Sequence, residues 1–107
     1  MASRREKIEA MLADEPGDTF LRYSLAMELQ KEERHEDSLK LLNELTQDDP
    51  PYVPAYFMAG QQLGGLRRIN EAREILRNGI EEARKQNDHH AAGEMSEFLA
   101  SLGALGE

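Results

Sequence analysis

His89 and His90 are the residues that first raise the question of a metal site. Neighbouring side chains on a helix point about 100° apart, so these two imidazoles do not converge on one ion. Glu94 lies four residues after His90 and shares its helical face. The metalloprotease arrangement, two histidines four residues apart with a glutamate between them, is absent. We therefore interpret this segment as the solvated start of a helix and predict no metal ion.

Other catalytic patterns are equally sparse. The chain has no cysteine, which removes thiol nucleophiles, disulfides and zinc–thiolate sites. No Gly-x-Ser-x-Gly sequence occurs, and the glycine-rich stretch 60–65 is not followed by the Lys-Ser/Thr of a phosphate loop. We predict a protein that is not an enzyme and needs no cofactor or small-molecule substrate, and a small hydrolase or metal enzyme remains the alternative.

Composition limits the partners. The 107 residues carry a net charge of -8, and an acidic surface repels nucleic acids and anionic membranes. Arg67 and Arg68 could locally grip an acidic peptide or a phosphate, although an ordinary solvated turn explains them as well. The sequence has neither a signal-peptide core nor a run of transmembrane length. We expect a cytoplasmic protein with one domain and a modest core.

The elements that would position any site follow a period of 34 residues. The first copy contains Leu25, Ala26, Leu29, Ser38, Leu42 and Leu45, and the second contains Ala59, Gly60, Leu63, Ala72, Leu76 and Gly79. Such a period is typical of stacked supersecondary units. The small residues predict close approach of two antiparallel helices at Ala26, Gly60, Ser38 and Ala72, and the leucines would fill the space around those contacts.

Residues 19–86 resemble the tetratricopeptide repeat (TPR), whose pattern places an aromatic, Leu-Gly, Tyr, Ala, Phe and Pro at fixed intervals. The chain departs from that pattern at Arg22, where the aromatic is missing, and at Arg84, where the closing proline is missing. The resemblance implies an all-α, right-handed superhelical array of antiparallel helix pairs. It also implies a scaffold that binds proteins, without naming the partner.

We expect one TPR-like domain over residues 1–107. Its parts are a leading helix over about 3–13, repeat one over about 19–50, repeat two over about 53–86 and a capping helix over about 88–103.

Caps and turns supply the boundaries of these helices. Ser3 with Glu6 predicts a capping box, and Asp18 predicts the next N-cap. We place a turn at residues 34–36 and a frayed tail at 103–107. The missing turn glycine predicts that the turn after Gly65 differs in shape from the first one.

In the family, the first helix of each repeat lines the concave side, and this implies a groove for a partner. The groove residues implied here are Phe20, Tyr23, Ser24, Met27, Gln30, Phe57, Met58 and Gln61, with Pro54 beside them. Members that clamp chaperone tails place lysine, arginine and asparagine at such positions, so that function is disfavoured. Methionines and aromatic residues instead provide an adaptable apolar strip.

Three occupants of this strip remain open. The C-terminal helix could fold back and bury it as core, a partner peptide or amphipathic helix could bind it, or a second copy of the chain could cover it. We predict a protein–protein interaction module, and the alternative is a homo-oligomeric assembly unit whose groove is occupied by its own copy.

Overall fold

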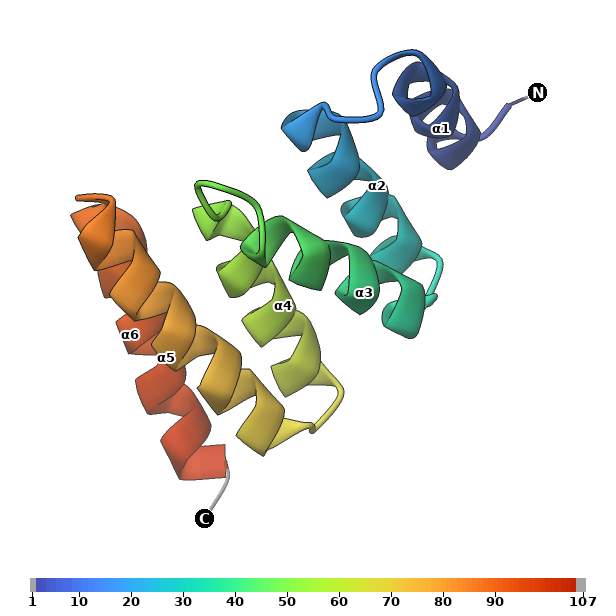
Figure 1. Ribbon diagram of the computed structural model, residues 1–107. Helices are drawn as coiled ribbons and strands as arrows, with labels where there is room; N and C mark the ends of the chain where they lie inside the picture. Colours follow the sequence, from blue (N-terminus) through green and yellow to red (C-terminus); the bar gives the residue numbers. More distant parts are fainter. Residues whose placement is uncertain (1, 106–107) are drawn as a thin grey trace.

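The computed structural model describes residues 2–105, and this part of the chain consists of six helices without a strand (Figure 1). The helices are α1 (Arg4–Asp14), α2 (Thr19–Lys31), α3 (His35–Thr46), α4 (Val53–Gly65), α5 (Ile69–Lys85) and α6 (His89–Leu105). Within residues 2–105, no helix is long and apolar enough to cross a membrane.

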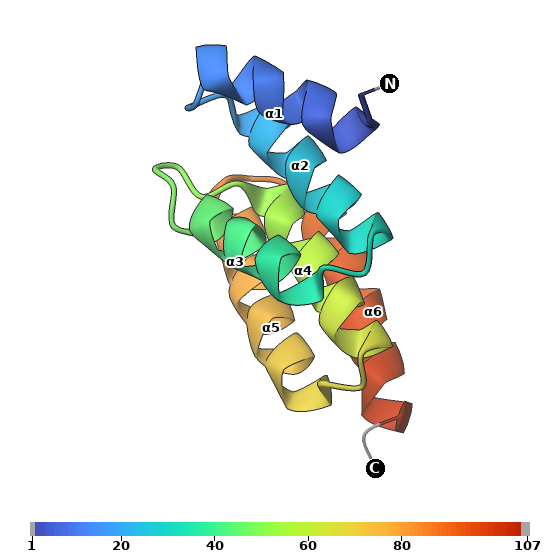
Figure 2. The ribbon, with the colours of Figure 1, turned by 90° about the vertical axis from the view of Figure 1, so that its right-hand side faces the viewer.

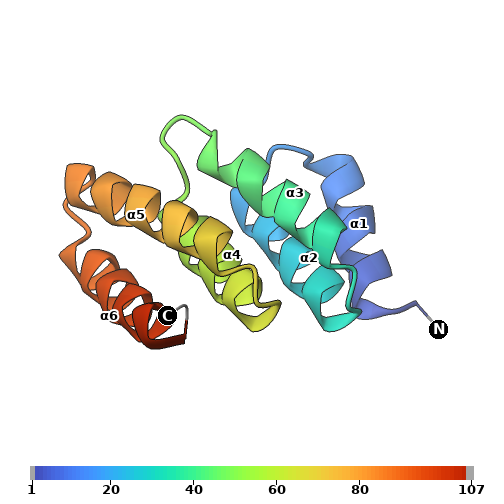
Figure 3. The same cartoon turned by 90° about the horizontal axis from the view of Figure 1, so that it is seen from below.

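The helices form two layers that alternate along the chain. Seen from below, α2, α4 and α6 form one row and α1, α3 and α5 form the other (Figure 3). Each helix packs against the next in sequence, and α4 also contacts α6. The array is elongated, 45 × 29 × 18 Å, with α1 at one end and α6 near the other (Figure 2). This is the all-α array of antiparallel helix pairs that the resemblance to the tetratricopeptide repeat implies.

Small residues allow the paired helices to approach each other, as predicted. Ala26, Ser38 and Ala72 are completely buried. A Cβ atom added to Gly60 would lie 2.5 Å from Cδ2 of Leu76, so any larger residue would force Leu76 to shift where α4 meets α5. Apolar burial around these contacts is the main stabilising term of the fold.

A buried polar network, which the period does not predict, joins the two repeats. Gln62 is only 3% exposed, and its Nε2 lies 2.9 Å from Nδ1 of His35. The single Ser38 hydroxyl proton is within hydrogen-bonding distance of two acceptors, the carbonyl oxygen of Ala26 at 2.7 Å and Oε1 of Gln62 at 3.2 Å. Because these groups satisfy one another, α2, α3 and α4 are tied together without an unpaired buried amide.

The turns that end α2, α4 and α5 share one geometry. Residues with side chains occupy the left-handed position in each turn: Glu33 with φ 61°, and Arg67 and Asn87 with φ 64°. The next amide donates to the carbonyl five residues earlier, as from Arg34 to Leu29 and from Arg68 to Leu63, both 2.9 Å. This pattern is the Schellman motif.

Two expectations about these turns are wrong. The first turn ends before His35, where α3 begins, so it does not occupy residues 34–36. The second turn has the same hydrogen bonds as the first, because Arg67 adopts the left-handed conformation in place of glycine.

The predicted caps are present. Ser3 and Glu6 form the reciprocal capping box of α1, and the Asp18 carboxylate accepts from the Leu21 amide at 2.9 Å. The prediction of a frayed tail from residue 103 is wrong for residues 103–105, because α6 continues to Leu105. Leu102 is 1% exposed, so its burial keeps this end of α6 on the core. Residues 106–107 of the predicted tail lie outside the described part.

Candidate protein-binding groove

Four of the predicted groove residues line one hollow on the α2, α4 and α6 layer. Tyr23 comes from α2, and Phe57, Met58 and Gln61 come from α4. The hollow has a volume of about 250 Å³. Its other wall comes from α6 and the residue before it. This wall consists of Asp88, His90, Ala91 and Glu94.

The other four predicted residues do not line this hollow. Phe20 is 68% exposed in the first turn of α2, and Met27 and Gln30 are half-buried further along that helix. Ser24 is only 8% exposed, so neighbouring residues already cover it and it offers no free surface. The structure therefore brings together the middle of the predicted strip and leaves Phe20 apart from it.

Aromatic contacts hold the walls of the hollow. The rings of Tyr23 and Tyr52 meet edge to face, with centroids 5.4 Å apart. Burial raises the pKa of the Tyr23 phenol, and the nearby Tyr52 phenol raises it further. This packing fixes Tyr23 as a rigid contact surface that loses little side-chain entropy when a partner binds.

The C-terminal helix covers part of the strip. Phe57 packs edge to face against Phe98 of α6, with ring centroids 6.0 Å apart. Phe57 is half-buried against the core cluster that contains Met95 and Leu102. The C-terminal helix therefore covers one side of Phe57, as the first of the three expected arrangements has it. Tyr23, Met58 and Gln61 still border open space.

A second hollow, of about 440 Å³, extends from the first along the α4–α6 seam. Gln61 lines both hollows, and Phe57 and Phe98 each line one of them. The remaining residues of the second hollow are Gly64, Gly65, Arg67, Ser101 and Leu102. We call the two hollows together the α4–α6 groove.

The two ends of the α4–α6 groove differ in charge. Asp88 and Glu94 line the first hollow, and Glu94 Oε1 lies 3.3 Å from Nε2 of His90. Arg67 lines the second hollow and makes no ion pair with any residue between 2 and 105. Arg68, its neighbour, is already engaged by Glu71 at 2.6 Å and also by Glu36.

Sequence reasoning missed the contribution of α6 to this site. The period of 34 residues does not give the correct start of α6. The N-cap of α4 is Tyr52 and the cap of α6 is Asp88, so the two caps are 36 residues apart. Aligning the helix caps instead of the period would have placed His90 and Glu94 beside the strip.

Solved structures establish the family. A solution structure of a tetratricopeptide repeat domain protein from Salinibacter ruber matches with a TM-score of 0.78 and 32% identity, over 84% of this chain and 91% of that chain. The chain belongs to the tetratricopeptide repeat family.

Two further structures share the fold, and one of them is a crystal structure of the same Salinibacter ruber domain. A crystal structure of a TPR domain protein from Salinibacter ruber gives a TM-score of 0.73 at 32% identity, covering 82% of this chain and 99% of that one. The solution structure of a Bordetella parapertussis protein gives 0.82 at 28% identity, covering 97% and 90%. No family model and no curated protein matched the sequence. TPR modules typically mediate protein–protein interaction.

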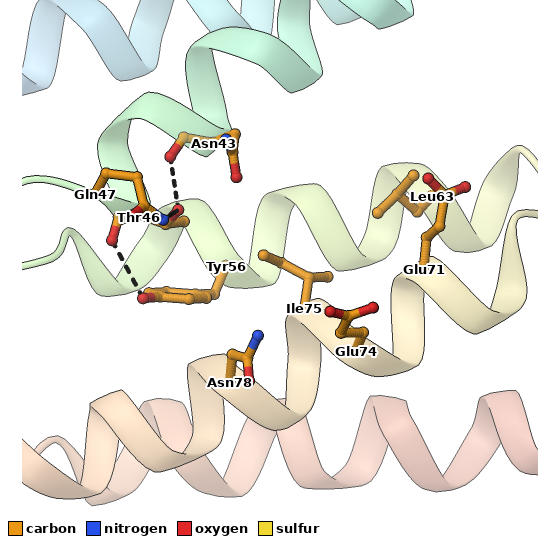
Figure 4. A pocket seen from close by; sticks show the side chains of 9 residues that line it. All are labelled: Asn43, Thr46, Gln47, Tyr56, Leu63, Glu71, Glu74, Ile75 and Asn78. Atoms are coloured by element: carbon orange, nitrogen blue, oxygen red, sulfur yellow. Dashed lines mark hydrogen bonds between the residues drawn. The ribbon is translucent and has the colours of Figure 1, made fainter.

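This TPR chain also has a hollow on its opposite face, between α3 and α5 (Figure 4). Its volume is about 380 Å³, and Tyr56, Leu63 and Ile75 provide the apolar part of its lining. The Tyr56 hydroxyl is held by the carbonyl oxygen of Thr46 at 3.3 Å. The polar part of the hollow's lining consists of amides and carboxylates, namely Asn43, Gln47, Asn78, Glu71 and Glu74. The hollow therefore has a more polar border than the α4–α6 groove.

Among residues 2–105, no group of three or more histidines, aspartates and glutamates is placed to hold a metal ion. Arg68 lowers the pKa of the Glu71 carboxyl by hydrogen bonding, as in a surface ion pair. What the α4–α6 groove offers a partner is an apolar floor, exposed amide and hydroxyl groups, and charges at its two ends.

Proposed function

We propose that this TPR chain is a non-enzymatic interaction module that binds a peptide or amphipathic helix of a partner protein in the α4–α6 groove. The observation that carries the proposal is the open hollow between Tyr23, Phe57 and Met58. Aromatic rings and methionine supply contact area that adapts to apolar side chains of a partner. The net charge of -8 favours a protein partner over nucleic acid or an anionic membrane.

The groove residues in this proposal are Tyr23, Phe57, Met58 and Gln61, extended by His90 and Glu94 of α6. Phe20, Met27 and Gln30 stay proposed contacts for a longer partner segment that continues along α2. The cytoplasmic location stays a prediction of the sequence.

The test is a pull-down from native lysate with the wild type and a Tyr23→Ala/Met58→Ala double variant. Met11→Ala is the matched control, because Met11 is 48% exposed on α1 and outside the groove. We expect one protein to be enriched by the wild type and by Met11→Ala, and to be lost with the double variant. Far-UV circular dichroism must show that the double variant remains helical.

A synthetic segment of the captured protein should then bind the purified wild type and lose at least about tenfold in affinity with the double variant. Truncating a hot-spot residue at the centre of an interface costs about 2 kcal/mol or more, and a tenfold loss of affinity corresponds to about 1.4 kcal/mol. Equal capture by the folded double variant would contradict the proposal. Recovery of nothing but copies of the bait would favour the homo-oligomeric alternative instead.

A further inference from the structure

We propose that the α4–α6 groove selects a partner segment with opposite charges at its two ends: a lysine or arginine beside Asp88 and Glu94, an apolar centre, and an acidic side chain beside Arg67. This inference rests on the proposed function and adds the polarity and chemistry of the partner. It concerns the turn residue Arg67 and the α6 wall, neither of which belongs to the strip that the sequence predicts.

The two hollows form one path. Pro54, Phe57, Gln61 and Gly64 recur on one face of α4 at helical spacing, and Gln61 borders both hollows. On the facing helix α6, the order is the same: His90 and Glu94 line the first hollow, and Phe98 and Ser101 line the second. The residue order therefore runs in one direction along both walls.

The centre of the path is apolar. The Phe57 and Phe98 rings meet there, and Met58 flanks them. Gly64 packs under Leu102 and Phe98 of α6, whereas a Cβ added to Gly65 would meet no atom within 4 Å, so the α4 side of the second hollow is open at Gly65. A partner backbone can approach α4 closely at this point, and its apolar side chains can reach the aromatic pair.

The two ends of the path carry opposite charges. Asp88 and Glu94 are exposed at the first hollow, and no lysine or arginine is among the residues that line it. Arg67 is exposed at the second hollow, where no carboxylate is among the lining residues. Complementary charges steer a partner and fix its direction more than they raise its affinity, so reversing the partner would place like charges together at both ends.

The dimensions give the expected spacing of the partner's charges. From Pro54 to Gly65, α4 rises about 17 Å at 1.5 Å per residue. A basic and an acidic residue would then be separated by about five residues in an extended segment or by about eleven in a helix.

The probe is a phage-displayed library of about 16 random residues between fixed flanks, selected against the full-length chain. Selections on Arg67→Glu and on Arg77→Glu run in parallel. Arg77 is exposed on α5 outside both hollows, so it changes the net charge equally without touching the groove. Circular dichroism confirms that each variant is folded.

We expect peptides from the wild type and Arg77→Glu to carry a basic residue at one end of an apolar centre and an acidic residue at the other. Arg67→Glu should select basic residues at both ends. A peptide selected on the wild type should bind Arg67→Glu about five- to tenfold more weakly, since the reversal replaces an exposed ion pair with a repulsion. The same peptide with its acidic residue changed to lysine should prefer Arg67→Glu.

Two failures can be told apart with the Tyr23→Ala/Met58→Ala variant. If selected peptides lose binding to this variant but show no acidic preference linked to Arg67, the charge inference is wrong and the groove function stands. If no selected peptide depends on Tyr23 and Met58, the proposed function fails and the inference fails with it.

Discussion

Side chains at left-handed backbone positions are a local cost in this chain. Glu33 and Arg67 both have positive φ, where an L-residue is disfavoured by about 1–2 kcal/mol relative to the right-handed region. Glycine meets no such penalty, although it loses more backbone entropy on folding. The helices nevertheless end here, because the Schellman hydrogen bonds satisfy carbonyl groups that would otherwise remain unpaired.

We therefore expect Glu33→Gly to raise the free energy of unfolding by about 0.5–1 kcal/mol. Glu33→Ala is the matched control, since it removes the same charge and keeps the unfavourable conformation. Urea denaturation followed by circular dichroism measures both variants. A gain for alanine equal to that for glycine would show that the charge, and not the backbone, is responsible.

At Gly60, where two helices approach closely, we expect that replacing the glycine destabilises the fold. Gly60→Ala would place its Cβ 2.5 Å from a methyl group of Leu76, a residue with no exposed surface that has little room to move. We expect a loss of about 1–3 kcal/mol in unfolding free energy. Gly93→Ala is the control: Gly93 lies within α6 with no atom within 4 Å of an added Cβ, so alanine there should stabilise by about 0.5–1 kcal/mol.

At the scale of the element, α6 has two tasks. Its inner face completes the core through Ala92, Met95 and Leu102, which are at most 5% exposed. Its other face supplies His90 and Glu94 to the groove. The same helix therefore closes the end of the array, as terminal helices of repeat proteins must, and forms a wall of the proposed binding site.

Met95→Ala tests the first of these tasks. Met95 is fully buried, and its sulfur would lie 2.7 Å from a Cβ added to Gly79, so it fills the space that this glycine leaves between α5 and α6. We expect a loss of about 2–5 kcal/mol. Glu97→Ala, at an exposed position of α6, should stay within about 0.5 kcal/mol of the wild type. Equal denaturation midpoints for both variants would contradict the assigned packing.

At the scale of the whole molecule, the array exposes only a few large apolar side chains. Among residues 2–103, the exposed large apolar side chains are Met11, at 48%, and Phe20, at 68%, and they lie on two adjacent helices at the α1 end. Isolated exposed apolar residues are ordinary on monomers and do not form a large patch. The proposed function therefore expects a monomer that leaves its groove open to a partner.

Sedimentation velocity over about a hundredfold range of concentration should give one monomeric species for the wild type and for Phe20→Glu. The Cα radius of gyration of 14.3 Å provides the shape reference for small-angle scattering. A mass that rises with concentration and falls back to the monomer in Phe20→Glu would favour self-assembly through the α1 end.

The helix pairs and their internal contacts could be predicted from the sequence. Ala26, Gly60, Ser38 and Ala72 recur at the period of the repeat, and each lies at a close helix–helix contact, because a structural repeat places equivalent residues in equivalent environments. Local chemistry also decided the caps at Ser3 and Asp18, since a short polar side chain reaches the free amides of its own helix. Tyr23, Met58 and Gln61 followed from the same periodicity combined with the family resemblance.

Tertiary structure decided the rest. The turn backbone at Arg67 could not be predicted from residue type, because hydrogen bonds to the preceding helix impose a conformation that arginine alone disfavours. The position of α6 depends on the apolar side that the packed pair of α4 and α5 presents. That packing buried one side of Phe57, set His90 and Glu94 across from Met58, and placed Arg67 at the far end of the groove. A period along the chain fixes which residues are equivalent, whereas the walls of a groove come from helices that are distant in sequence and meet only when the array closes.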